Sequence, residues 1–216
     1  MPPPQSAAEL KNLALLAIYA KPLTNFDNTD SPTAISVNLL YDQCRQELLR
    51  MHCWNFARRR VALNLDPTVT PLFDYEGAYQ LPSDLLHLHH IGTEYDQWDN
   101  RVKHDIQGRH IYYEDAPETL YIEYTVDVTD VSQMDALFKK AFRYYLASEL
   151  CMPVTGNIKV ALEVEKKYER AMKAAGAINA QERPMRVIDR DPIQEARANW
   201  DESAPQVIVP DDAWPS

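Results

Sequence analysis

The hydrophobic period of this sequence changes twice, and these two changes constrain the fold more than any other feature. Before Trp54, apolar residues recur at three- and four-residue steps, which is typical of amphipathic helices. Over residues 56–127 they alternate with polar residues, as in strands with one buried face. From Met134 to about residue 178 the helical period returns. The sequence therefore predicts two helices, a β insertion and two further helices, which is an α+β fold.

Two helices are expected before the insertion, over residues 7–20 and 32–53. Ser6 followed by Glu9 is a capping box for the first, and Ser31 followed by a proline is a start signal for the second. Apolar residues surround the first helix almost completely, so we expect it to be buried between neighbours. The second helix carries one apolar stripe, formed by Val37, Leu40, Tyr41, Cys44, Leu48 and Met51.

The insertion predicts a small, mostly antiparallel β-sheet. No helical segment alternates with its strands, as a parallel sheet would require. The strands are expected at residues 61–65, 75–81, 85–93, 111–113 and 120–126. The last is the clearest, because its even-numbered residues are apolar and its odd-numbered residues are Tyr121, Glu123 and Thr125.

The final two helices, over residues 133–151 and 157–178, are expected to form an antiparallel hairpin. Ser132 is a suitable N-cap for the first, and Pro153 is expected to end it, because proline disfavours a helical conformation in the residue before it. The first helix has a broad apolar stripe, and the second has a narrow stripe with charged residues on its other side. The narrow stripe comprises Ile158, Ala161, Leu162, Tyr168, Met172 and Ala175.

The N-terminal and C-terminal helix pairs are expected to pack together as a helical bundle, with the sheet inserted between them, so that residues 1–180 form one domain. Residues 181–216 differ in composition, because prolines and acidic residues are frequent there and large apolar residues are isolated. We expect this segment to be an extended C-terminal arm that becomes ordered against a partner.

Charge and cysteine content narrow the classes of partner and compartment. The net charge of -10 disfavours general binding to the DNA backbone, because such binding requires cations that displace counterions. Three cysteines without close spacing predict free thiols in a reducing compartment, with Cys44 and Cys151 buried on or next to helix stripes. No apolar run approaches the ~20 residues that span a bilayer, so a soluble intracellular product without membrane contact is expected.

One histidine cluster invites a chemical interpretation. His87 and His89 would share one face of a strand, with His90 on the other, and two imidazoles can begin a metal site. Such a site needs three or four ligands, and the other candidates, His104 and His110, lie in a different segment. We therefore favour half-exposed strand or interface histidines, and we expect no metal ion, no cofactor and no catalytic residue.

Charged clusters leave two interpretations open. Arg58, Arg59 and Arg60 could bind phosphate, but in an acidic chain we favour pairing of Arg58 and Arg60 with carboxylates, nearby or on a neighbouring subunit. A pair of carboxylates acting as acid and base in hydrolysis also stays open as an interpretation. The chain has many carboxylates and no pair stands out among them; examples are Asp74, Glu76, Glu114 and Asp115. The sequence has no HExxH, GxSxG, P-loop, GxGxxG or CxxC motif.

Several short motifs follow one another in the order found in one protein family. The first motif directly follows the second helix and is WNFARRRVAL, residues 54–63. The next two are YQLPSDLLHLHHI, residues 79–91, and IYYEDAPETLYIEY, residues 111–124, which precedes the hairpin. The matching residues are Trp54, Phe56, Ala57, Arg58 to Arg60, Leu81, Pro82, Asp84, Tyr124, Phe138, Leu146, Ala147 and Thr155 to Asn157. Over about residues 7–180 the chain resembles the tail tubular protein A family of short-tailed bacteriophages, also called head-to-tail adaptors or gatekeepers.

The resemblance implies a structural protein of the virion tail, located at the head–tail junction and made in the host cytoplasm, and not an enzyme. Such adaptors form a ring, usually of twelve copies, docked under the portal protein, with the tail nozzle protein attached below. Genomic DNA passes through the channel during packaging and ejection without sequence-specific binding. An acidic subunit would repel the DNA phosphates and let the duplex slide.

Two sets of interface candidates follow, because a head-to-tail ring uses two different faces of each subunit. We predict a subunit interface that contains Arg58, Arg59, Arg60, Glu163, Lys166, Lys167 and Arg170. We predict that the arm binds the portal through Trp200, Val207, Ile208, Val209 and Trp214. Two other classes stay open: a cell-wall glycan hydrolase, testable at Glu114 and Glu123, and a monomeric protein-binding module.

Overall fold

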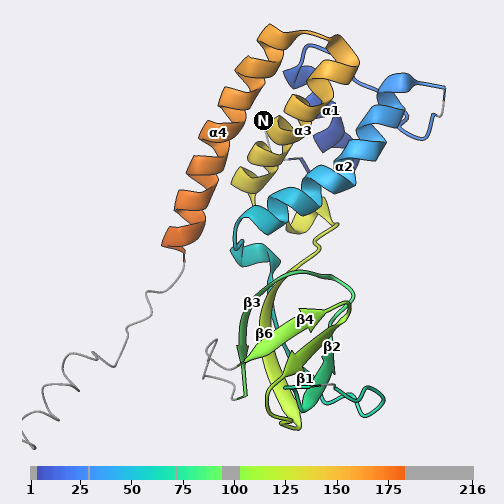
Figure 1. Cartoon of the computed structure of the whole chain (residues 1–216). Coiled ribbons are helices and arrows are strands. Elements are labelled where there is room, and N and C mark those ends of the chain that lie inside the picture. Colours follow the sequence, from blue (N-terminus) through green and yellow to red (C-terminus); the bar gives the residue numbers. More distant parts are fainter. Residues whose placement is uncertain (1–3, 29, 72, 94–102, 183–216) are drawn as a thin grey trace, which may run out of the picture. The chain divides into compact units, whose positions relative to one another are not determined.

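The chain has an α+β fold in which helices precede and follow a β insertion, as the two changes of hydrophobic period predict (Figure 1). It divides into residues 1–183 and 184–216, and all the described residues belong to the first of these. The computed structural model describes residues 4–28, 30–71, 73–93 and 103–182. The predicted arm lies outside these residues, except for its first two positions.

Helices α1 to α4 form one bundle with α3 at its centre, because α3 packs against each of the other three (Figure 1). Their bounds are Ala7–Ala17 for α1, Pro32–Met51 for α2, Ala136–Thr155 for α3 and Ile158–Gln181 for α4. The broad apolar stripe predicted for α3 is confirmed as its buried face. It includes Phe138, Ala141, Phe142, Leu146 and Leu150.

Three side chains cap the helix starts before and after the insertion. Ser6 and Ser31 cap α1 and α2 as predicted, each accepting a hydrogen bond from the amide three residues further on. The prediction for α3 is wrong, because Ser132 lies in a short 3-10 turn over Val131–Gln133. Asp135 is the N-cap instead, since its carboxylate accepts hydrogen bonds from two amides of the first turn at 2.7 and 3.2 Å.

Helix α3 continues past Pro153, so the prediction that this proline ends the helix is wrong. In the last turn a proline removes only its own N–H donor, and few later hydrogen bonds depend on it. The helix closes at Gly156, whose left-handed conformation (φ 62°) lets its amide donate to the carbonyl oxygens of Cys151 and Met152. Asn157 then caps α4.

Helix α1 is shorter and less buried than predicted. Helix α1 ends at Ala17, because Tyr19 has a left-handed backbone (φ 62°). Helix α2 is also slightly shorter than predicted, since it ends at Met51 and not at residue 53. Leu16 is 52% exposed, so the prediction that α1 is covered on all sides is wrong. The helix packs mainly on α3, and its opposite side faces outward.

The β insertion contains two three-stranded antiparallel sheets instead of one sheet. The first has the order β1-β6-β3, with bounds Arg58–Asn64, Thr119–Val126 and Leu85–Gly92. The second has the order β2-β5-β4, with bounds Gly77–Gln80, His110–Tyr113 and His104–Gln107. An isolated bridge between Leu65 and Tyr79 joins the two sheets. Strand β4 is absent from the sequence prediction.

The helices and the first sheet share one hydrophobic core. Trp54, on the passage from α2 to β1, is 1% exposed, and its ring meets that of Phe138 edge-on at 5.0 Å. Arg45 of α2 is also buried and donates hydrogen bonds to the Asp127 carboxylate, just after β6. Cys44 and Cys151 are buried free thiols, as predicted.

Candidate functional site

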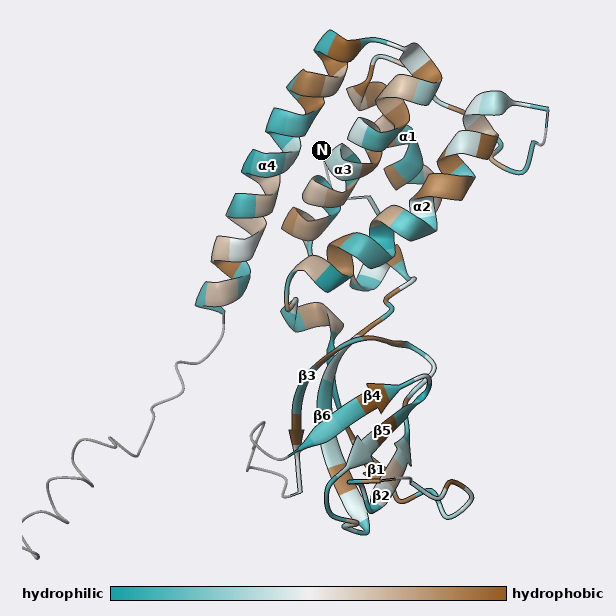
Figure 2. Cartoon of the chain, viewed as in Figure 1, coloured by the Kyte–Doolittle hydropathy of each residue, from teal (hydrophilic) through white to brown (hydrophobic). Residues whose placement is uncertain are grey.

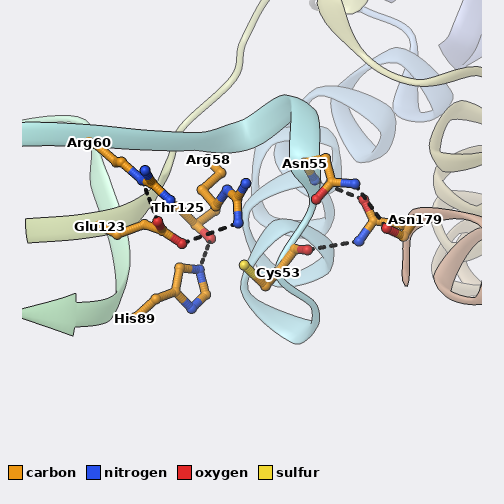
Figure 3. Close-up of polar contacts among 8 residues, drawn as sticks. All are labelled: Cys53, Asn55, Arg58, Arg60, His89, Glu123, Thr125 and Asn179. Carbon is orange, nitrogen blue, oxygen red and sulfur yellow. Dashed lines mark hydrogen bonds and ion pairs between the residues drawn. The ribbon is translucent and has the colours of Figure 1, made fainter. Parts of the chain in front are cut away.

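Glu123 is the centre of a buried polar cluster on the first sheet (Figure 3). The register of β1 and β6 places Arg60 opposite Glu123 and Arg58 opposite Thr125. Arg60 Nε donates to the Glu123 carboxylate at 2.7 Å, and Arg58 Nη1 donates to it at 3.4 Å. Glu123 is only 2% exposed, so the two arginines supply the positive charge that a buried carboxylate requires.

The pKa of Glu123 bears on the hydrolase alternative. Burial alone would raise this pKa, but the hydrogen bond from Arg60 and the charges of Arg58 and Arg60 outweigh burial and hold it below its ordinary value. A general acid in glycan hydrolysis needs a raised pKa, so the shift at Glu123 is opposite to that requirement. Glu114, the second candidate, is exposed and follows β5 of the other sheet.

The third arginine of the row also has a carboxylate partner within the chain. Arg59 donates to Asp84 at 2.7 Å, and the other oxygen of Asp84 accepts a hydrogen bond from the Tyr124 hydroxyl at 3.1 Å. The favoured interpretation, pairing with carboxylates nearby, is therefore confirmed for Arg58 and Arg60, and Arg59 has such a partner as well. Their contact with a neighbouring subunit stays a prediction.

The histidines of β3 lie together without forming a metal site. The rings of His87 and His89 are 4.9 Å apart, which agrees with the predicted shared face. His89 Nε2 lies 2.7 Å from Thr125 Oγ1, so this ring belongs to the polar cluster on the first sheet (Figure 3). Within the described ranges, no group of three or more His, Cys, Asp or Glu side chains is arranged to hold a metal ion.

Asn179 joins the end of α4 to the passage between α2 and β1 (Figure 3). Its side chain accepts a hydrogen bond from the Asn55 amide at 2.8 Å and donates to the Cys53 carbonyl at 2.8 Å. Its backbone carbonyl accepts from the Asn55 side chain at 2.9 Å. Asn179 was not predicted as a contact residue, although it continues the four-residue steps of Ala171 and Ala175, where an apolar residue is expected.

The buried side of α4 differs from the predicted stripe. Val164, Ala171 and Ala175 are buried, whereas Ile158 and Leu162 are 62% and 54% exposed. Leu162 precedes Val164 by two residues, which is about 200° around the helix, so the two cannot face the same neighbour. Hydrophobic and hydrophilic residues accordingly alternate along the visible side of α4 (Figure 2).

A groove of about 210 Å³ lies between α3 and α4, and we call it the basic groove. It is lined by Leu137, Lys140, Tyr144, Lys167, Arg170, Ala171 and Ala174. Lys167 binds Glu163 at 2.6 Å, the pair that the sequence places one helical turn apart. In the described part of the chain, no hydrogen bond or ion pair holds Lys140 or Arg170.

The predicted subunit interface therefore separates into two surfaces. Lys167 and Arg170 belong to the basic groove, with Glu163 beside them and Lys166 exposed on α4. The arginines of β1 instead contact two carboxylates of the first sheet region: Glu123 of β6, and Asp84 in the turn before β3. Lys140 and Tyr144 were missed, because only the packing of α3 on α4 brings them beside Arg170.

The predicted portal-binding residues of the arm lie outside the described residues, so this interface stays a prediction. They are Trp200, Val207, Ile208, Val209 and Trp214. None of the described helices combines the length and the apolar composition needed to cross a membrane. A scan against models of protein families and a search of curated proteins both find no match to the chain.

Proposed function

We propose that this chain is the structural subunit of a head-to-tail adaptor ring in a short-tailed phage, placed between the portal and the tail nozzle. The observation that carries the proposal is that the motif residues of the resemblance contact one another. Trp54 packs against Phe56 and Phe138, with ring centroids 6.2 and 5.0 Å apart. Tyr124 hydrogen-bonds to Asp84. Motifs that are distant in the sequence therefore meet where the helices join the first sheet.

The remaining motif residues serve packing and chain reversal. Phe138, Leu146 and Ala147 have no exposed surface. Gly156 closes α3 with a positive φ, and Asn157 caps α4 by accepting hydrogen bonds from two amides of its first turn. These roles are architectural, which favours a structural subunit over a catalyst.

The distribution of charge also favours a subunit with two different faces. Residues 136–182 have a net charge of +3 within a chain of net charge -10. A subunit with a basic helical hairpin and an acidic remainder has the asymmetry that a head-to-tail contact between copies requires. An acidic remainder also suits a channel along which DNA slides.

Imaging of the chain with the portal protein of the same phage by cryo-electron microscopy tests the proposal, with native mass spectrometry to count subunits. We expect a ring, of twelve copies, docked on the portal. A chain that stays monomeric and undocked in the presence of the portal would overturn the proposal. Turbidity measurements on cell walls test the hydrolase alternative. This alternative would be favoured if the chain lysed the cell walls and if Glu114→Gln or Glu123→Gln abolished the lysis.

A further inference from the structure

Helix α2 carries an exposed acidic and apolar surface, which we call the acidic ridge and define as Ile35, Leu39 and Asp42. These residues follow one another at steps of four and three, so they lie on one side of the helix. Leu39 is 72% exposed, Ile35 is 44% exposed, and the side chain of Asp42 is 72% exposed. Leu39 and Ile35 together provide a small apolar surface that a partner can bury.

The acidic ridge has cations as well as carboxylates beside it. Asp42 Oδ1 accepts a hydrogen bond from the buried Arg45 at 3.2 Å. Asp27, in the loop before α2, acts on the same lysine as Asp42, so both carboxylates lie on this side of the bundle. That lysine, Lys11, is half-buried, donates a hydrogen bond to Asn38 at 2.8 Å and lies over the ring of Tyr41. Among the described residues, Oδ1 is the oxygen of Asp42 that accepts a hydrogen bond, so the exposed carboxylate keeps Oδ2 for a partner from another copy.

The basic groove has the opposite charge and a similar apolar content. Among the described residues, Lys140 and Arg170 form no hydrogen bond or ion pair. The apolar part of the lining comes from Leu137, Ala171 and Ala174.

The two surfaces belong to helices on different sides of the bundle centre. Helices α2 and α4 both pack on α3, and in Figure 1 the N-terminal half of α2 and helix α4 lie on opposite sides of α3. One bundle therefore cannot place its own acidic ridge in its own basic groove. A second copy can, and the same two surfaces stay free at the ends of the pair.

We propose that the acidic ridge of one copy binds the basic groove of the next, with Leu39 as the apolar anchor and Asp42 as the ionic partner of Lys140 and Arg170. This inference rests on the proposed ring and names the contact that builds it. The contact is heterologous, because it joins two different surfaces, and such contacts close into rings when the rotation between copies permits. Opposite charges fix the partner and speed the encounter, while the apolar anchor slows dissociation.

Self-association of the full chain at low and high salt, measured by sedimentation velocity, tests this contact. We expect Leu39→Ser and the pair Lys140→Glu with Arg170→Glu each to weaken association at least tenfold. Higher salt should weaken the wild type in the same direction, because the charges are exposed. The matched controls are Ile106→Ser, an exposed apolar residue of β4, and Lys173→Glu, an exposed cation of α4 outside the groove. The controls should associate like the wild type.

A mixing experiment identifies the geometry of the contact. The Leu39→Ser chain keeps an intact groove, and the Lys140→Glu, Arg170→Glu chain keeps an intact ridge. Mixed together, they should form a one-to-one dimer and nothing larger, as native mass spectrometry would show. Absence of this dimer, with both variants folded by circular dichroism, would overturn the proposal.

Two further outcomes separate this inference from the proposed function. Rings that dock on the portal regardless of the ridge and groove substitutions would overturn the contact and leave the adaptor function in place. A wild-type chain that forms the ridge-to-groove contact but never docks on the portal would overturn the adaptor function alone. If neutralising Asp201, Glu202, Asp211 and Asp212 abolishes association while Leu39→Ser does not, another segment occupies the groove and the proposal fails.

Discussion

The arginine row of β1 and the cations of the basic groove are both positive clusters in an acidic chain, but they differ in whether the fold provides each cation with a carboxylate partner. Each arginine of the row binds a carboxylate of its own chain, because the strand register places Glu123 and Asp84 beside it. Lys140 and Arg170 have no such partner among the described residues. The difference indicates which cations stabilise the subunit and which are free to bind another molecule.

The largest effect that this comparison predicts is on stability, at Glu123. Replacing Glu123 with Ala leaves two arginines without their buried carboxylate, and we expect the free energy of unfolding to fall by about 3 kcal/mol. Urea denaturation measures this change through its midpoint. Glu114→Ala is the matched control, because Glu114 is exposed, and it should change stability by less than about 0.5 kcal/mol. Equal effects of the two substitutions would contradict the assigned role of the cluster.

Asn179 provides a second internally satisfied site, with a smaller expected effect. Asn179→Ala removes the hydrogen bonds to the Asn55 amide and the Cys53 carbonyl, and we expect the free energy of unfolding to fall by about 2 kcal/mol. Amide hydrogen exchange should also accelerate at residues 52–55, where α4 is joined to the passage into β1. An exposed asparagine, Asn64, is the control and should show neither change. Unchanged exchange in Asn179→Ala would mean that this link does not hold the passage.

The pH dependence of stability tests the role of Glu123 in a second way. The folded chain holds the pKa of Glu123 below its ordinary value, so this residue contributes stability above its unfolded pKa and loses it as pH falls through its folded pKa. Below about pH 5, wild-type stability should therefore decline more steeply than that of Glu123→Gln. Urea midpoints between pH 7 and pH 3 measure both slopes, and parallel slopes would contradict the assignment.

Local signals in the sequence were sufficient for much of the helical architecture. The Ser6 and Ser31 caps and the buried stripe of α3 depend on residues within a few positions of each other. The end of α3 was predicted wrongly at Pro153. The helix ends instead at the turn closed by Gly156, so this turn outweighs the local preference against proline in a helix. The division into two sheets depends on pairing between distant strands, which periodicity does not encode.

The candidate surfaces were harder to predict, for related reasons. The charge of Lys167 and Arg170 is visible in the sequence, but their neighbours Lys140 and Tyr144 join them only through helix packing. The partner of Arg60 depends equally on strand register, which only the pairing with β6 defines. Leu39 did carry a signal, since it lies off the stripe of Val37 and Tyr41, and an apolar residue there indicates a second contact.

The smallest expected effect on stability is at the basic groove, where charge has no internal partner to lose. Lys140→Ser with Arg170→Ser should change the free energy of unfolding by no more than about 0.5 kcal/mol, because both side chains lack described hydrogen bonds. Urea denaturation at a protein concentration low enough to keep the chain monomeric measures this, and Arg58→Ser with Arg60→Ser is the contrasting pair. The β1 pair should cost about as much as Glu123→Ala, about 3 kcal/mol, since it removes both arginines from the buried Glu123 carboxylate. If the groove pair costs as much, its cations serve the subunit itself, and the contrast between the two clusters disappears.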